Sequence, residues 1–224
     1  MHHRSDKLTD AEAAIRAALF DGATLMVGGF GLVGKPLTLV SALNASPFTG
    51  LTVISNNLGE PGRYLGQTLL LGKIRRAVGS YFTSNPDAVR AHAEGRLEVT
   101  LLPQGTLSES IRAGGAGLGG FYTPTGVGTL LAEGHEVREL GGRQFLLQTP
   151  LTADVALVRA HRADRLGNLV YRATARNFNP LMATAARTVI AEVDEIVEPG
   201  ELDPEIVATP HLHVDRLVLA QERL

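Results

Sequence analysis

The stretch DGATLMVGGFGLVGKP, residues 21–36, decides the fold. Its apolar run at 23–27 lies between the turn signal Asp21-Gly22 and a cluster of glycines. A continuous apolar run between turn signals is typical of a parallel strand covered on both faces. Pro36 stands where a helix takes its first residue, and apolar residues at 37–43 continue that helix. The stretch therefore predicts a strand, a glycine-rich turn and a helix.

The same alternation extends outward from this stretch. Thr9-Asp10-Ala11-Glu12 has the spacing of a capping box ahead of a helix, and Asn85-Pro86 has the residues of a helix start. Further strands are expected at 51–55, 74–82, 97–102, 144–148, 154–161, 169–172, 188–193 and 214–219, with a helix at 180–186. This order predicts an α/β fold with a mainly parallel sheet flanked by helices. We expect one domain over residues 1–224, from which the glycine-rich stretch 105–128 could form an excursion.

Composition excludes several classes of protein. The chain has 224 residues, 44% hydrophobic and 20% charged, which is typical of a soluble globular protein with a sizeable core. The absence of cysteine removes disulfides, thiolate metal sites and cysteine nucleophiles. A net charge of −2 gives no basic field for nucleic acid or an anionic membrane. No apolar run approaches the roughly 18 residues of a membrane span, and no signal peptide begins the chain, so a cytoplasmic protein is expected.

One motif within the opening stretch suggests a nucleotide-binding enzyme. Residues 29–34, GFGLVG, match the G-x-G-x-x-G of dinucleotide-binding folds. Those folds place an acidic residue about 20 positions further on to hold the ribose. Here the strand at 51–55 runs into Asn56-Asn57, and Glu60 comes late. An NAD-dependent oxidoreductase is therefore the weaker hypothesis, although a helix N-terminus still offers N–H groups to an anion.

A longer pattern is more specific than this motif. Residues 21–36 contain an Asp-Gly pair, apolar residues, Gly-Gly-Phe, and a later Gly and Pro. This pattern resembles the signature of the A (alpha) subunit of family I CoA-transferases. Blocks that also resemble the family follow in order: SNN at 55–57, PQGTL at 103–107, IRAGGAG at 111–117, TPTG at 123–126 and ARNFNP at 175–180. The resemblance covers nearly the whole chain.

This resemblance implies a reaction and a partner. Family members move coenzyme A from an acyl-CoA, typically succinyl-CoA, to a 3-oxoacid such as acetoacetate or 3-oxoadipate, and related members use acetate or butyrate. A glutamate attacks the thioester, and the resulting anhydride is converted to a glutamyl-CoA thioester. That glutamate belongs to a Ser-Glu-Asn-Gly block of the B (beta) subunit, and the nearest block here is Ser108-Glu109-Ser110, at a predicted helix start. The resemblance thus implies no permanently bound cofactor, and it implies an α2β2 heterotetramer with a B subunit.

Three neutral amides are the candidate substrate-binding residues. Asn56, Asn57 and Gln104 follow predicted strands, at the carboxyl edge where α/β sheets bind ligands. Amides can stabilise an oxyanion without quenching a nucleophilic carboxylate, as a nearby cation would. By resemblance, Gln104 and Asn56 donate to the substrate carboxylate or the thioester oxygen. The alternative for Asn56-Asn57 is a turn that binds its own backbone.

The remaining candidates concern the glycines and histidines. By resemblance, a CoA-associated loop comprises Gly28, Gly29, Phe30, Gly31, Leu32, Val33 and Gly34. The alternative is a close strand–helix turn within the core, with Phe30 as a packing residue. The run 114–120 would form either a backbone wall near the partner or the pantetheine arm, or a mobile loop. Arg176-Asn177 would cap a helix or line the interface. His211 and His213 would share one face of a strand, but without a nearby carboxylate cluster no metal site is expected.

A non-catalytic acyl-CoA-binding protein is the third hypothesis. Such a protein would have kept the fold without a partner.

Overall fold

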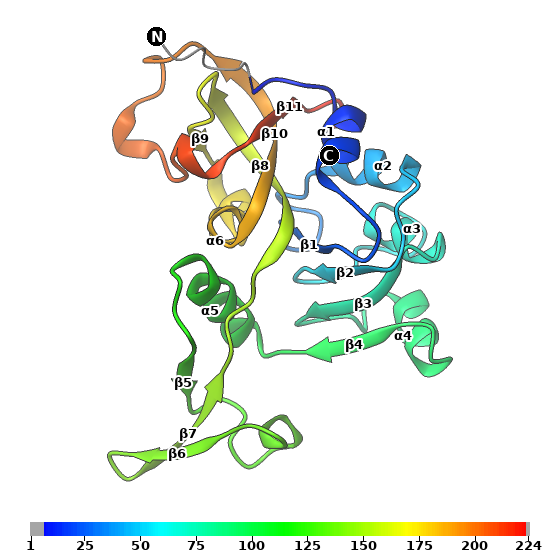
Figure 1. The fold of residues 1–224 in the computed structure, drawn as a ribbon, viewed down its shortest axis with the longest axis vertical. Helices are drawn as coiled ribbons and strands as arrows, with labels where there is room; N and C mark the ends of the chain where they lie inside the picture. The colour runs from blue at the N-terminus through cyan, green and yellow to red at the C-terminus, as the bar shows by residue number, and fades with distance from the viewer. Residues whose placement is uncertain (1–6, 223–224) are drawn as a thin grey trace.

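An eight-stranded sheet forms the centre of the molecule, in a computed structural model that describes residues 7–222 (Figure 1). The strand order is β11-β10-β8-β1-β2-β3-β4, with β9 paired to β8. The strands are β1 (Thr24–Val27), β2 (Leu51–Ile54), β3 (Ile74–Gly79), β4 (Glu98–Leu101), β8 (Ala153–Asp164), β9 (Leu169–Val170), β10 (Ala186–Val197) and β11 (Arg216–Leu219). Its described pairs are parallel except β8 with β9. The predicted fold class is confirmed.

Helices cover both faces of this sheet. One face carries α1 (Ala11–Ala18), α2 (Leu37–Ala45), α3 (Leu65–Leu70) and α4 (Pro86–Ala93), and the other carries α5 (Gln104–Gly115) and α6 (Asn179–Thr184). Successive residues of β1 alternate between the two cores: Leu25 and Val27 join the first, and Met26 joins the second. This explains why Leu25, Met26 and Val27 are all apolar, because each of these side chains meets a helical layer.

Side chains begin two of these helices. The Asp10 carboxylate accepts from the backbone N–H of Ala13 at 2.8 Å, and Asn85 Oδ1 accepts from the N–H of Asp87 at 3.0 Å. The cap expected at Asn85 is therefore present, whereas the cap of α1 is Asp10 and not Thr9. An oxygen at the N-cap satisfies one N–H that the helix itself leaves free.

A smaller antiparallel sheet projects from the main body (Figure 1). It contains β5 (Phe121–Thr123), β7 (Arg143–Gln148) and β6 (Val137–Leu140) in that order, with the 3₁₀ helix η1 (Leu130–Ala132) in the connection. We call residues 121–148 the arm. The glycine-rich stretch 105–128 is thus divided, because its first half forms most of α5 and its last residues enter the arm.

Some local predictions were wrong. Ser108-Glu109-Ser110 lies inside α5 and not at a helix start, because the helix already begins at Gln104. His211 and His213 lie in the 3₁₀ helix η4 (His211–His213) and not in a strand. Gly114 lies in the last turn of α5, which ends at Gly115, and a Cβ added to Gly114 would lie 2.0 Å from the Leu151 carbonyl oxygen. Within residues 7–222 no helix has the length and apolar character needed to cross a membrane.

Candidate functional site

Asn56, Asn57 and Gln104 lie together at the carboxyl edge of the sheet. Asn56 and Asn57 follow β2, and Gln104 begins α5 just after β4. Asn56 Nδ2 donates to Gln104 Oε1 at 3.4 Å, and Asn57 Nδ2 donates to Asn56 Oδ1 at 3.2 Å. The parallel order β2-β3-β4 places these strand ends at one edge, so two residues 48 positions apart come into contact.

These hydrogen bonds set the direction of the Gln104 amide. Asn56 is only 2% exposed, whereas Gln104 is exposed. Because Gln104 Oε1 accepts from Asn56, its Nε2 group is directed away from the asparagine pair. Within residues 7–222 that Nε2 group has no protein partner among the hydrogen bonds of the site. The edge therefore presents neutral N–H donors to the outside, a group suited to an oxyanion.

The two asparagines also hold the local backbone. Asn57 Oδ1 accepts from the N–H of Gly59 at 2.9 Å, which is the turn that the alternative interpretation expected. The carbonyl oxygen of Asn56 accepts from the N–H groups of Ser80 and Tyr81 at 3.1 and 3.2 Å. Asn56 and Asn57 are thus fixed by their surroundings, and Gln104 is the exposed member of the three.

The glycine loop, residues 28–34, forms a tight hairpin after β1. Phe30 and Val33 exchange two backbone hydrogen bonds of 3.0 and 3.1 Å, so Gly31 and Leu32 are the two residues of its turn. Phe30 is 47% exposed. The hairpin therefore carries Phe30, which was expected to be a packing residue, out to the surface of this chain.

The base of this loop is packed against its own chain. A Cβ on Gly28 would lie 1.8 Å from Asn179 Oδ1, and one on Gly34 would lie 2.4 Å from the Ala175 carbonyl oxygen. Gly31 at the tip has no such neighbour within 4 Å. The close strand–helix turn thus accounts for Gly28 and Gly34, while the tip remains accessible.

An acidic side chain already occupies the N-terminus of α2. The N–H of Leu39 donates to Glu192 Oε2 at 3.0 Å, and the Glu192 side chain is fully buried. A dinucleotide pyrophosphate would need the free N–H groups of this same helix end. This carboxylate therefore argues against the NAD hypothesis.

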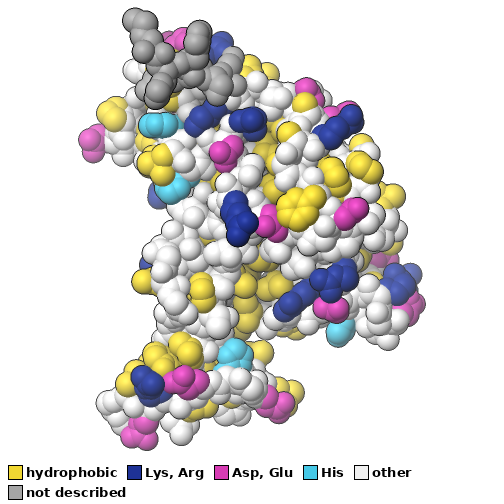
Figure 2. Space-filling view, in the orientation of Figure 1, with side chains coloured by type: hydrophobic (Ala, Val, Ile, Leu, Met, Phe, Trp, Pro, Cys, Tyr) yellow, Lys and Arg dark blue, Asp and Glu magenta, His cyan; other side chains and the backbone are white. Residues whose placement is uncertain are grey.

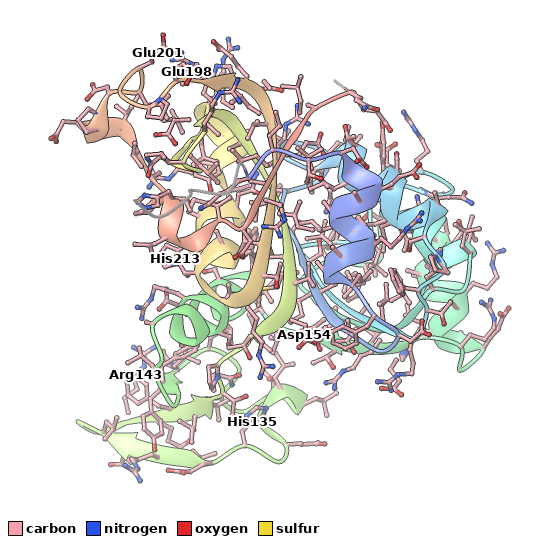
Figure 3. The ribbon with its side chains drawn as sticks, turned by 45° about the horizontal axis from the view of Figure 1, so that its top comes forward. His135, Arg143, Asp154, Glu198, Glu201 and His213 are labelled. Atoms are coloured by element: carbon pink, nitrogen blue, oxygen red, sulfur yellow. The ribbon has the colours of Figure 1, made fainter. Side chains whose placement is uncertain are left out.

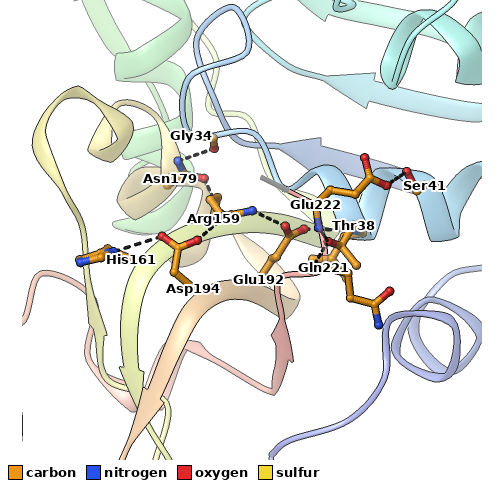
Figure 4. Close-up of polar contacts among 11 residues, drawn as sticks. Gly34, Thr38, Ser41, Arg159, His161, Asn179, Glu192, Asp194, Gln221 and Glu222 are labelled. Carbon is orange, nitrogen blue, oxygen red and sulfur yellow. Dashed lines mark hydrogen bonds and ion pairs between the residues drawn. The ribbon is translucent and has the colours of Figure 1, made fainter. Parts of the chain in front are cut away.

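Glu192 belongs to a charged network that joins β8 to β10 (Figure 4). Arg159 pairs with both Glu192 and Asp194, and Asp194 Oδ2 lies 3.1 Å from His161 Nδ1. Burial raises the pKa of Glu192 to about 7, although the Arg159 charge opposes that rise. Burial also acts to raise the pKa of Asp194, but the hydrogen bond with His161 and the Arg159 charge outweigh it and lower that pKa. The network holds α2, and with it the end of the glycine loop, against the sheet.

Lys35 connects the glycine loop to the edge of the sheet that carries Asn56, Asn57 and Gln104, which we call the amide edge. Its side chain is buried, and Nζ donates to Ser55 Oγ at 3.0 Å, directly before Asn56 in the chain. Burial lowers the pKa of this amine to about 7. Lys35 also lines a cavity of about 530 Å³, together with Arg159, but none of the three amides lines that cavity.

Replacing Lys35 by methionine is expected to change how stability depends on pH. Between about pH 7 and pH 10.5 the Lys35 amine is protonated in the unfolded chain but neutral in the folded chain. Its contribution to the free energy of unfolding of the wild type therefore rises with pH across this window. Lys35→Met removes that slope. We expect it to stabilise the chain on the order of 2 kcal/mol at pH 7 and by less at pH 9.5. Thermal unfolding at both pH values measures the difference.

The matched control is Ser55→Ala. This variant removes the hydrogen-bond partner of Lys35 but keeps the buried amine, so its stability should keep the wild-type slope. A Lys35→Met gain that is equal at both pH values would contradict the titration of Lys35.

Sequence reasoning missed the residues that brace the glycine loop. Asn177 Oδ1 accepts from the N–H of Gly29 at 3.1 Å. Asn179 Nδ2 donates to the Gly34 carbonyl oxygen at 3.0 Å, and its Oδ1 accepts from the N–H of Arg159 at 2.9 Å. The block ARNFNP at 175–180 was the available signal, but its partner lies about 145 positions earlier.

The histidines within residues 7–222 do not form a common site. Figure 3 shows His135 on the arm and His213 on η4, well separated in the fold. Across residues 7–222, no group of three or more His, Cys, Asp or Glu side chains could hold a metal ion.

Comparisons with known proteins place this geometry in context. The family model described as Coenzyme A transferase matches residues 8–220. The chain is 54% identical over 213 residues to the A subunit of the succinyl-CoA:3-ketoacid coenzyme A transferase of Xanthomonas campestris pv. campestris (strain B100), covering 95% of this chain and 88% of that protein. It is 48% identical to the alpha subunit of the acetate CoA-transferase of Escherichia coli (strain K12), covering 90% and 92%.

A solved structure shares the fold over a longer chain. The acyl-CoA transferase of E. coli O157:H7, solved as a thioester complex with CoA, superposes with a TM-score of 0.85 at 21% identity. The match covers 98% of this chain and 48% of that chain. The present chain therefore spans about half the length of that solved protein.

Proposed function

The chain belongs to the coenzyme A transferase family, and we propose that it is the A subunit of an enzyme that moves CoA between succinyl-CoA and a short-chain 3-oxoacid. Its partner is a B subunit, with which it assembles as an α2β2 heterotetramer. The relatives, which are named as A and alpha subunits, support a two-subunit enzyme. No permanently bound cofactor is needed, because CoA enters as part of the substrate.

The proposed chemistry begins with a glutamate of the B subunit. Its carboxylate attacks the thioester carbonyl of succinyl-CoA, which forms an acyl-glutamyl anhydride and releases the CoA thiolate. The thiolate then attacks the glutamyl carbonyl, which gives a glutamyl-CoA thioester and frees succinate. The 3-oxoacid carboxylate repeats both steps in reverse and leaves as its CoA thioester. Each step passes through a tetrahedral oxyanion that needs hydrogen-bond donors.

Gln104 is the proposed donor to these oxyanions. The 3.4 Å bond from Asn56 to Gln104 carries the proposal, because it turns the Nε2 group toward the open edge. Asn56 and Asn57 act behind Gln104 as binding and orienting residues. All three are uncharged, so they stabilise developing charge without lowering the basicity of the incoming glutamate.

The tip of the glycine loop is the proposed contact for CoA. Gly31 has open space at its Cα, and Phe30 and Val33 are exposed beside it. Such a tip lets a thioester or a pantetheine arm approach the backbone closely. Gly28 and Gly34 support this tip from inside the chain.

A second substrate class has specific support. The 48% identity to the alpha subunit of an acetate CoA-transferase makes acetate or a related short acid the alternative acceptor. Competition between acetoacetate and acetate for the same assembled enzyme would rank the two.

The test is reconstitution with a B subunit. We expect the purified chain alone to be inert, because it lacks the nucleophile, and co-expression with a CoA-transferase B subunit to give exchange between succinyl-CoA and acetoacetate. Formation of acetoacetyl-CoA, followed by absorbance or by chromatography, measures the reaction. Full activity of the lone chain, or hydride transfer from NADH, would overturn the proposal. No exchange with any B subunit would favour the non-catalytic hypothesis.

A further inference from the structure

A groove lies between the arm and the segment that leads into Gln104. It has a volume of about 300 Å³. One wall is the end of β4 and Leu101-Leu102-Pro103, and the other is η1 of the arm with Leu130 and Leu131. We call it the arm groove. Gln104 itself does not line the groove, but Pro103 and Thr106, on either side of it in the chain, do.

The arm groove is bordered by exposed apolar side chains. Leu130 is 82% exposed, and Leu101 and Leu131 are also exposed. In Figure 2 hydrophobic side chains gather where the arm meets the main body. Several exposed apolar side chains around one groove are typical of an interaction site, whereas apolar side chains that are exposed singly are common and need no explanation.

The arm also lacks a core of its own. All four residues of β6 are exposed, and Leu146 is the buried apolar residue of this three-stranded sheet. A small sheet with so little buried apolar area is marginal by itself. Its projecting position is therefore best explained by a partner that packs on it.

We propose that the arm groove is the docking surface for the B subunit, which inserts apolar side chains between η1 and the end of β4. This inference rests on the proposed function. The amide edge offers donors but no carboxylate among its three residues, so the nucleophile must arrive from the side where Gln104 is exposed. A partner seated in the arm groove reaches that side, and it also keeps water from the anhydride and thioester.

The experiment compares two exposed leucines by their effect on association. Leu130→Asp puts a charge into the arm groove, and the matched control Leu212→Asp puts one on η4, where Leu212 is 71% exposed. The B subunit is the one that restores exchange with the wild-type chain. Affinity is measured by surface plasmon resonance, and thermal unfolding confirms that both variants fold.

We expect Leu130→Asp to weaken binding of the B subunit at least about 30-fold, as a central interface side chain does, and Leu212→Asp to leave it unchanged. Equal binding by wild type and Leu130→Asp, with exchange intact, would overturn the docking surface but not the function. A lone wild-type chain that dimerises, and that Leu130→Asp makes monomeric, would assign the groove to a second copy. Failure of the wild-type chain to bind or react with any B subunit would overturn the proposed function itself.

Discussion

Replacing Gln104 by alanine is expected to lower kcat of the assembled transferase about 10²–10³-fold, as loss of one oxyanion donor does. The variant removes the N–H donors that Asn56 turns toward the open edge. KM for the acid should change less, because the donors act most strongly on the charge that develops in the transition state. Steady-state rates of exchange from succinyl-CoA to acetoacetate give both constants.

Two further variants separate donation from simple loss of volume. Gln104→Glu keeps the size and the acceptor oxygen but replaces the donating amide by a carboxylate, so it should be at least as slow as Gln104→Ala. Gln67→Ala removes a glutamine of α3 away from the amide edge and should leave the rate unchanged. A Gln104→Ala enzyme with wild-type kcat would remove Gln104 from the proposed chemistry.

The sequence predicted the layers of this fold because burial on both faces leaves a clear signal. Apolar runs such as the one at β1 have no polar face, and this is visible without any knowledge of partners. Two features were harder to predict from the sequence: the strands of the arm and the full lengths of β8 and β10. The arm contains few buried residues, so its strands carry weak patterns, and β8 and β10 extend beyond their apolar segments to 12 residues each.

The candidate site was predictable as a set of residues but not as an arrangement. The positions of Asn56 and Gln104 after strands were enough to expect that they meet. The buried partners of the glycine loop and of α2 were not predictable, because Asn179 reaches Gly34 and Glu192 reaches Leu39 from segments far along the chain. A single sequence does not show which distant residues contact each other, and the pattern of apolar residues carries no information about hydrogen bonds between them.

The glycine at position 28 gives the sharpest test of how the loop is built. An alanine Cβ at this position would lie 1.8 Å from Asn179 Oδ1, well inside contact distance. Asn179 is fully buried and holds Gly34 and Arg159 through hydrogen bonds, so it cannot move without leaving buried polar groups unpaired. We expect Gly28→Ala to lower the free energy of unfolding by about 3 kcal/mol or more, from overpacking and from lost hydrogen bonds. Chemical denaturation measures the loss.

Two comparisons decide whether packing is the reason for that glycine. Gly119→Ala meets no atom within 4 Å and should be close to neutral. In an Asn179→Ala background the added methyl group has room, so Gly28→Ala should cost less than about 1 kcal/mol there, and the two effects will not add. An equal cost in both backgrounds would contradict the clash. A Gly28→Ala chain with wild-type stability but weaker binding of CoA by the assembled enzyme would instead show that ligand approach, and not internal packing, requires glycine at the base of the loop.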